Sequence, residues 1–343
     1  MPTGSAPTAP GTGVGPRLTF ARKAAGYLGA GTLSLYLLLK VYWVVAAFFG
    51  IGVDPDSSAA NWIGINTVTV GMAVIGVAVA LALAQDWGRR VPAWMVVFTS
   101  WTAAGFLVSI IPVHAIRAFL PAQGDPVDVE LGVHSWELTL VAVGFIGMGV
   151  GLTVAGPIYL RERWPAAFVG VAGDHRPPRS RSAAVGIALA LVVAATTLYW
   201  LLGGEVFVND SIYDTGDPNT AALFCNEAFW ALAAAASAWV LLRARSRVPA
   251  WIPMALLWIG SGSLFAWNCW RLFISLVFAP FQTMNTLEQP FAAIAVEAAG
   301  ALAGALLFAT ALAVYSARRG RVRELRSRAW SPPDSPRPPT STR

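Results

Sequence analysis

The hydrophobic residues of this chain fall into eight long runs, which are separated by shorter polar segments. The runs cover roughly residues 24–50, 60–85, 93–119, 136–160, 183–203, 221–243, 250–279 and 290–316. A helix needs about 20 mostly apolar residues to cross the hydrocarbon core of a bilayer, and longer runs can tilt or extend beyond it. The pattern therefore predicts an all-α integral membrane protein with eight transmembrane helices.

The polar segments between the runs alternate in charge. Arginine-rich segments precede the first run, follow the last, and join the second run to the third, the fourth to the fifth and the sixth to the seventh. The other segments carry acidic residues, such as Asp54, Asp128 and Asp214. Positively charged loops stay on the cytoplasmic side of a membrane. We therefore expect both termini in the cytoplasm and the protein in the cell (plasma) membrane, with the lipid bilayer as its partner.

A five-residue motif occurs twice in the chain. Arg-Val-Pro-Ala-Trp stands at residues 90–94 and again at 247–251, an offset of 157 residues that also relates Trp43 to Trp200 and Gly105 to Gly262. Four crossings in each copy leave the two copies facing the same way, which defines a parallel repeat. We predict a disordered tail at 1–16, a first four-helix repeat at 17–163, a cytoplasmic linker at 164–182, a second four-helix repeat at 183–320 and a basic, Pro-rich cytoplasmic tail at 321–343.

The residues that open each copy also carry a resemblance. Lys-Val-Tyr-Trp at 40–43 and Leu-Tyr-Trp-Leu-Leu-Gly-Gly at 198–204 are each followed by an acidic segment and then by Val-Pro-Ala-Trp. In these segments the chain resembles an uncharacterised actinobacterial family of small four-helix integral membrane proteins, and it is similar to a tandem fusion of two such units. The resemblance implies the architecture and no activity.

The composition agrees with a membrane protein and excludes several classes of function. Hydrophobic residues make up 56 % of the chain and charged residues 12 %, against about 25 % charged residues in soluble domains. The sequence has no Walker, HExxH, GxSxG or paired-aspartate motif, which argues against the common ATPases, zinc proteases, hydrolases and prenyltransferases. Its two cysteines, Cys225 and Cys269, cannot form a thiolate metal cage, although a disulfide between them stays an alternative. We expect no nucleic-acid partner.

Six charged side chains interrupt the apolar runs in their outer halves, three basic and three acidic. A charge in hydrocarbon costs several kcal/mol, so each needs a partner or water. One interpretation is structural ion pairs between helices, or side chains that reach the headgroups. The other is an outward-facing polar cavity between the repeats, in a carrier or binding protein for a small amphipathic or anionic ligand. The candidate ligand-binding residues are Lys40, Arg117, Glu227, Asn268, Arg271 and Glu297, with Glu227 or Glu297 as a proton-coupled partner.

Two further interpretations stay open. In a membrane enzyme that acts on a lipid-soluble substrate, His114 or Glu137 would be the catalytic base. In a non-catalytic scaffold or sensor, the charges would all be paired. His114 and His134 invite a haem or metal site, but the second copy has no matching histidine, so we expect no such cofactor.

Small residues predict how the two copies meet. Gly147 and Gly151 in the fourth run, and Gly300 and Gly304 in the eighth, have the spacing that lets two helix backbones approach closely. We expect the fourth helix to pack against the eighth at the repeat interface.

Overall fold

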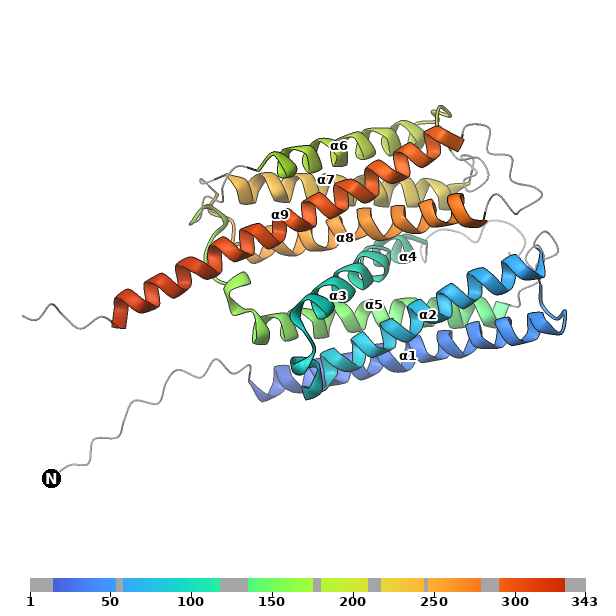
Figure 1. Cartoon of the computed structure of the whole chain (residues 1–343), viewed down its shortest axis with the longest axis horizontal. Coiled ribbons are helices and arrows are strands. Elements are labelled where there is room, and N and C mark those ends of the chain that lie inside the picture. Colours follow the sequence, from blue (N-terminus) through green and yellow to red (C-terminus); the bar gives the residue numbers. More distant parts are fainter. Residues whose placement is uncertain are drawn as a thin grey trace, which may run out of the picture.

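The computed structural model is all-helical, and it describes residues 15–53, 58–117, 135–174, 180–208, 217–243, 246–278 and 290–330 (Figure 1). Its α-helices are α1 (Pro16–Phe48), α2 (Ala59–Ala84), α3 (Ala93–Leu107), α4 (Ile111–Arg117), α5 (Ser135–Arg163), α6 (Arg181–Leu201), α7 (Pro218–Leu242), α8 (Trp251–Phe273) and α9 (Pro290–Trp330). Short 3-10 turns, η1 (Asp86–Arg90), η2 (Pro165–Ala167) and η3 (Ala172–Asp174), and a π-turn, η4 (Ile274–Phe278), extend or connect them.

Within the described part of the chain, eight helical stretches are long and apolar enough to cross a membrane, as the sequence predicts. The third stretch joins α3 to α4 as Ala93–Ala115. Large apolar side chains stay exposed along these helices, such as Leu38 at 65 % and Phe229 at 52 %. Water would not tolerate so much apolar surface, whereas lipid tails favour it. The fold is therefore that of a multi-pass membrane protein.

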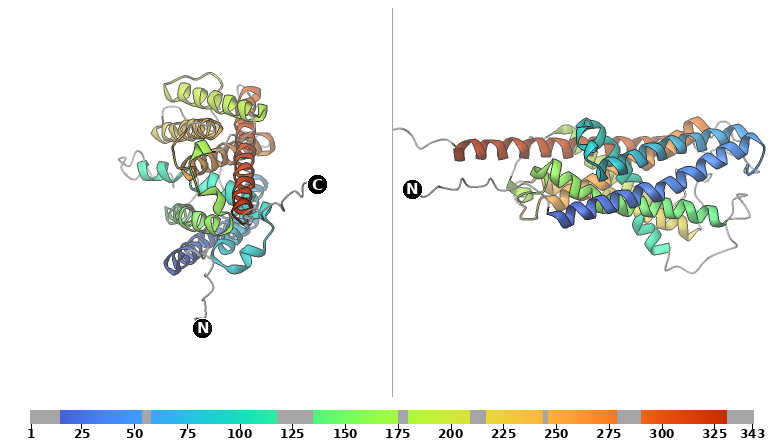
Figure 2. Two further views of the ribbon diagram at one scale, coloured as in Figure 1. Left: turned by 90° about the vertical axis from the view of Figure 1, so that its left-hand side faces the viewer. Right: turned by 90° about the horizontal axis from the view of Figure 1, so that it is seen from below.

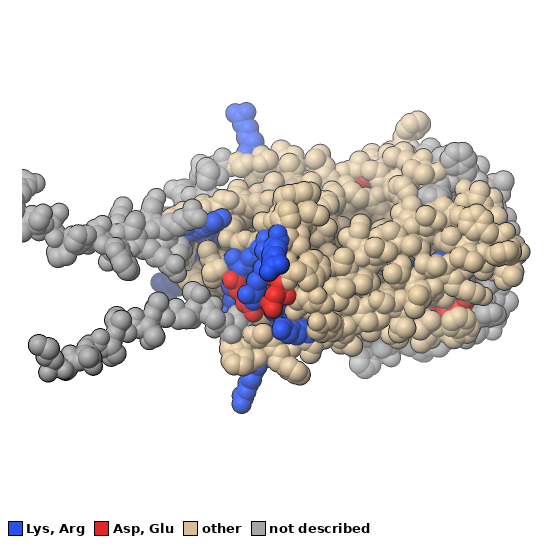
Figure 3. Space-filling model, turned by 60° about the horizontal axis from the view of Figure 1, so that its bottom comes forward, with Lys and Arg blue, Asp and Glu red and all other residues tan. Residues whose placement is uncertain are grey.

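Charge is distributed along the molecule as a membrane requires. Helix α1 begins and helix α9 ends at the same end of the helical bundle (Figures 1 and 2). Lys and Arg side chains gather at this end, and most of the remaining surface carries no charge in the view of Figure 3. Arg22 is fully buried there and donates to the Leu83 carbonyl at 2.6 Å, while Arg89 pairs with Glu162 at 2.6 Å. We call this the basic end.

The helices form two halves with α3 between them (Figure 1). In the first half, α1 packs against α2 and α5. In the second half, α6 packs against α7 and α9, and α8 packs against the same two helices. Helix α3 makes its most extensive contact with α8, across the boundary, rather than with α2 or α5 of its own half. The α3–α8 pair is therefore the main connection between the halves.

Trp101 and a pair of glycines form the centre of the α3–α8 interface. The Trp101 ring is 1 % exposed, stacks on Phe308 of α9 with ring centroids 4.1 Å apart, and donates from Nε1 to the Ser261 hydroxyl at 3.0 Å. One turn further along α3, Gly105 lies so close to Gly262 that a methyl group at Gly105 would overlap the Gly262 backbone. The absence of side chains at these two positions lets the helices approach closely.

The paired glycines of α5 and α9 serve other contacts than the sequence suggests. Gly147 and Gly151 face α1, where a methyl group at Gly151 would meet the Ala25 carbonyl oxygen at 2.8 Å. Gly304 faces α8, where a methyl group would meet the Ser261 carbonyl oxygen at 2.6 Å. The expected packing of the fourth crossing on the eighth is therefore wrong. Small residues show that a backbone approaches closely, but they do not identify which one.

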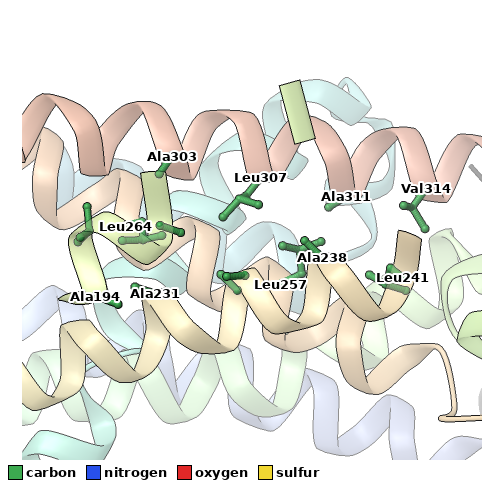
Figure 4. Packing of buried hydrophobic residues seen from close by; sticks show 14 of the residues in the cluster. Ala194, Ala231, Ala238, Leu241, Leu257, Leu264, Ala303, Leu307, Ala311 and Val314 are labelled. Carbon is green, nitrogen blue, oxygen red and sulfur yellow. The ribbon is translucent and has the colours of Figure 1, made fainter. Parts of the chain in front are cut away.

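The second half has a core rich in alanine. Figure 4 shows Ala194, Ala231, Ala238, Leu241, Leu257, Leu264, Ala303, Leu307, Ala311 and Val314 packed together from α6, α7, α8 and α9. Alanine side chains let helices pack closely through van der Waals contact, which is the main attraction between helices in lipid. This packing holds the four helices in fixed register around the polar residues described below.

Part of the predicted linker is packed against the second half. Ala172 donates its backbone N–H to Val248 at 2.9 Å, and Ala250 donates to Gly170 at 3.0 Å. The Arg318 guanidinium, 2 % exposed, donates to the Val169 and Val171 carbonyl oxygens. Residues 164–174 are thus fixed to both the α7–α8 connection and α9.

We expect Gly105→Ala to destabilise the protein by about 1–3 kcal/mol, the usual cost of overpacking a core, because the new methyl group would collide with the Gly262 backbone. Gly71→Ala is the matched control, since a Cβ at Gly71 of α2 meets nothing within 4 Å. Alanine should stabilise that helix by about 0.5–1 kcal/mol. Reversible unfolding in mixed detergent micelles measures both changes. Equal effects of the two substitutions would contradict the close α3–α8 contact.

Candidate functional site

Polar side chains inside the membrane-spanning helices form two clusters, one in each half. Glu227 and Glu297 lie in the third turn of α7 and of α9, and Arg271 lies in the last turn of α8. Lys40 lies near the end of α1 and Glu137 in the first turn of α5. Both clusters are therefore at the end of the bundle opposite the basic end. We call them the second-half cluster and the first-half cluster.

The second-half cluster is built on a two-pronged ion pair. Arg271 donates from Nη1 to Glu227 Oε2 at 2.8 Å, and from Nη2 to Glu227 Oε1. Asn268, one turn earlier on the same face of α8, donates from Nδ2 to Glu227 Oε1 at 3.0 Å. Parallel guanidinium–carboxylate hydrogen bonds fix both the separation and the orientation of the two groups. Glu227 therefore has its charge compensated and its position fixed.

Glu297 makes no ion pair with any residue that the structure describes. Its side chain is on α9 and the residue is 5 % exposed. Oε1 accepts a hydrogen bond from the Ser275 hydroxyl at 3.3 Å, while the buried Oε2 has no hydrogen-bond partner. Among the described residues, no Lys or Arg nitrogen lies within 4.0 Å of this carboxyl group. The cluster thus holds two carboxyl groups and one guanidinium.

A pocket brings these groups together. It is lined by Trp200, Phe207, Glu227, Asn268, Arg271, Ala293, Val296 and Glu297. Its empty volume is about 290 Å³, which includes the open mouth. Within this volume, the centre of a water molecule can move through only about 10 Å³ without touching the walls. That is space for roughly one water molecule. In this conformation the pocket fits a proton, a water molecule or a small cation.

The segment after α6 closes one side of this pocket. Phe207 lines it with a backbone φ of 67°, in the left-handed region that non-glycine residues rarely adopt. Trp200 donates from Nε1 to the Val206 carbonyl at 3.0 Å, and its ring packs against Phe224 with centroids 5.4 Å apart. The indole thus fixes the segment that bears Phe207 against the start of α7.

The first-half cluster surrounds Trp43. Lys40 donates from Nζ to Asn66 Oδ1 at 2.8 Å, and its ammonium lies 4.0 Å from the Trp43 ring centroid. The edge of the same indole donates from Nε1 to Glu137 Oε1 at 3.0 Å. Trp62 packs on Trp43 with ring centroids 5.6 Å apart. The Trp43 indole therefore contacts a cation with its face and a carboxylate with its edge.

The structure brings together four of the six residues predicted to bind a ligand. Glu227, Asn268, Arg271 and Glu297 line the same pocket, but this pocket lies within the second half rather than between the halves, where Trp101 and Phe308 stack. Lys40 belongs to the first-half cluster instead. These contacts therefore do not form one polar cavity that all six residues share. The Arg117 side chain lies outside the described residues.

The structure describes the surroundings of the remaining candidate residues only in part. His114 is half-buried on α4, and Glu137 is 5 % exposed and accepts from Trp43. His134 lies outside the described residues, so the haem or metal site is not tested. Among the residues described, no group of three or more His, Cys, Asp or Glu side chains is placed to hold a metal ion. Cys225 and Cys269 are both free thiols.

Two residues at this site could not be found by searching for charge. Ser275, which donates to Glu297, lies in the π-turn after α8. Trp200 is uncharged and lines the pocket. Its match with Trp43 at the offset of 157 residues is the signal that could have indicated this role, because each indole lies in the polar cluster of its own half.

The fold and these clusters define the class, an integral membrane protein that crosses the bilayer several times and buries ionisable groups near one end. Comparison with known proteins adds no narrower assignment, because no family model, no curated protein and no solved structure matches the chain.

Proposed function

We propose that this membrane protein is a carrier in which Glu297 binds a proton or a small cation as the coupling step of transport. The observation that supports the proposal best is the Glu297 carboxyl group, which is buried, lines a pocket, and has one oxygen without a partner. We place the pocket on the extracytoplasmic side of the cell membrane, since the arginine-rich segments lie at the opposite end.

The physical argument concerns the balance of charge. An isolated ionised carboxylate in a low-dielectric interior is strongly unfavourable, so such a group is neutralised or paired. Arg271 already pairs with Glu227 through two hydrogen bonds. Glu297 therefore needs a further positive charge, and the pocket beside it has space for a proton or a small dehydrated cation but not for a larger molecule.

Each neighbour then has a defined role. Arg271 pairs with Glu227 and orients it, Asn268 holds that carboxylate from a second side, and Ser275 orients Glu297. Gly300 is required because the Asn268 amide occupies the place of a side chain there, with a Cβ–Nδ2 separation of only 2.5 Å. A carrier needs a site that is filled and emptied, and Phe207 in its strained conformation marks the segment that would move to admit the ion.

The test compares purified wild-type protein with Glu297→Gln in two measurements. Infrared spectroscopy in sodium-free buffer should show the carbonyl stretch of a protonated carboxyl group that is lost in Glu297→Gln. Alternatively, if sodium is the bound cation, sodium chloride should stabilise only the wild type against unfolding relative to potassium chloride. A site filled at 100 times its Kd contributes about 2.7 kcal/mol.

Glu205→Gln is the matched control, because Glu205 is an exposed carboxylate in the same connecting segment as Phe207. It should behave as wild type in both measurements. The proposal is wrong if the wild type and Glu297→Gln show the same protonated-carboxyl band and the same response to sodium.

A further inference from the structure

We propose that the first half holds a second binding site of opposite character, formed by Lys40 and Trp62, which binds the phosphate group of an anionic lipid. The site is separate from the Glu297 pocket and does not depend on the transport function proposed above. It rests on hydrogen-bond donors for which the described residues provide no acceptor.

Lys40 has donors to spare. Its ammonium carries three N–H groups and makes one hydrogen bond, to the neutral Asn66 amide oxygen at 2.8 Å. Its other neighbours are ring faces, Trp43 at 4.0 Å and Tyr36 at 5.5 Å from the centroids. No carboxylate among the described residues lies within 4.0 Å of its nitrogen, so Lys40 makes no ion pair within the part of the chain that the structure describes.

The Trp43 indole explains why the nearby acid does not pair with Lys40. Glu137 accepts from the edge of this indole at 3.0 Å, whereas Lys40 lies over its face. Asn66 is also fixed, because its Nδ2 donates to the Trp62 carbonyl at 2.8 Å while its Oδ1 accepts from Lys40. These contacts hold the ammonium in place beside α2 and leave it able to bind an anion.

Trp62 adds a second unused donor to the same place. Its Nε1 is buried and has no hydrogen-bond partner among the described residues. A buried donor that makes no hydrogen bond costs about 1–3 kcal/mol. Trp62 is one turn before Asn66 on α2, and its ring packs on Trp43. The first-half cluster thus holds an ammonium and an indole N–H donor whose side chains both contact the Trp43 ring, and we propose that a phosphate group binds to both.

The position of this site favours a lipid over a free anion. Lys40 is eight residues before the end of α1 at Phe48, which is about 12 Å along the helix axis, and a lysine side chain can extend toward the headgroup layer from that depth. The neighbouring Leu38 and Tyr42 are 65 % and 51 % exposed, so α1 borders the bilayer at this depth, while Lys40 itself, two residues from each, points toward α2. A phosphodiester at the head of an acyl chain can reach the site from the membrane.

The experiment measures lipid binding to the full-length protein by native mass spectrometry, with phosphatidylglycerol as the probe. Lys40→Gln should weaken binding by about tenfold or more, the equivalent of one charge-assisted hydrogen bond. Trp62→Phe keeps the ring and removes the N–H, and should weaken binding by about two- to tenfold. Lys40→Arg should restore most of it, which separates loss of the charge from misfolding.

The chain supplies its own controls. Lys23 is the other lysine, exposed on α1 near the basic end, and Trp94 is 70 % exposed on α3. Lys23→Gln and Trp94→Phe should bind phosphatidylglycerol at this site as the wild type does. If inorganic phosphate, but not the lipid, stabilises the wild type and loses this effect in Lys40→Gln, the anion site stands and its lipid source is rejected. Equal lipid binding and equal phosphate response in all variants would overturn the site.

The outcome can be separated from that of the carrier proposal. Lys40→Gln should leave the infrared and sodium responses assigned to Glu297 unchanged, and Glu297→Gln should leave phosphatidylglycerol binding unchanged. Phosphatidylglycerol binding that is lost in Glu297→Gln and kept in Lys40→Gln would transfer the lipid site to the second half and refute the assignment to Lys40.

Discussion

Arg271→Ala should destabilise the protein by about 3–5 kcal/mol, the cost of removing one partner of a buried ion pair. The substitution leaves Glu227 without its two-pronged donor and places two uncompensated carboxyl groups, Glu227 and Glu297, in one pocket. Unfolding of the purified protein in mixed micelles measures the loss. The effect should be smaller in acidic buffer, where protonation neutralises the carboxyl groups.

Three further variants separate charge from packing in this cluster. Arg271→Lys keeps the charge without the parallel hydrogen bonds, and its loss should be intermediate. The double variant Arg271→Ala, Glu227→Ala removes both charges and should be more stable than Arg271→Ala alone. Arg243→Ala changes an exposed arginine that lies over the Trp239 ring, and should cost less than about 1 kcal/mol. A double variant less stable than Arg271→Ala would contradict the ion pair as the cause.

Trp101→Ala should cost about 3–5 kcal/mol, which is typical of emptying a buried tryptophan site. The indole connects the halves by stacking on Phe308 and by donating to Ser261, so its removal leaves a cavity at the α3–α8 interface and an unused acceptor. The same unfolding measurement applies. Limited proteolysis should also separate the two halves of the variant under conditions in which the wild type is not cleaved.

Trp94→Ala provides the comparison on the same helix. Trp94 is 70 % exposed at the start of α3, whereas Trp101 is 1 % exposed. Its truncation removes surface contact alone and should cost about 0.5 kcal/mol or less in detergent. If both alanine variants lose the same stability, Trp101 does not hold the halves together.

The crossings themselves could be predicted from the sequence, because the hydrocarbon core imposes a minimum length on each apolar run. The run expected at 250–279 corresponds to the span Trp251–Val277. The run at 93–119 differs, since α3 ends at Leu107 and α4 begins at Ile111, just before Pro112. Proline lacks the N–H that would continue the helical hydrogen bonds, so a break is understandable, although apolar content alone does not show it.

The partners of each helix could not be predicted, because lipid-facing and protein-facing surfaces are both apolar in a membrane protein. The glycine pairs of α5 and α9 show this, since they contact α1 and α8 rather than each other. The internal repeat stays a prediction. The contact between Gly105 and Gly262, which the offset of 157 residues relates, is what a twofold axis along the membrane normal between α3 and α8 would produce.

The candidate site was partly predictable for a simple energetic reason. A charge within an apolar run is costly, and this alone selects Glu227, Arg271 and Glu297. Sequence does not show that Arg271 pairs with Glu227 and leaves Glu297 with only Ser275, because that choice depends on how α7, α8 and α9 are rotated against each other. Nor does it show that Lys40 lies in a different cluster, since depth in the membrane gives no lateral position.

The most direct test of the central claim is the labelling of the membrane-embedded protein with a hydrophobic carbodiimide in sodium-free buffer, followed by peptide mass mapping. This reagent modifies carboxyl groups that carry a proton and are reachable from the membrane. We expect Glu297 to be modified, Glu227 to be spared because Arg271 donates to both of its oxygens, and added sodium to slow the reaction if sodium is the bound cation. Modification of Glu227 with none at Glu297 would contradict the account.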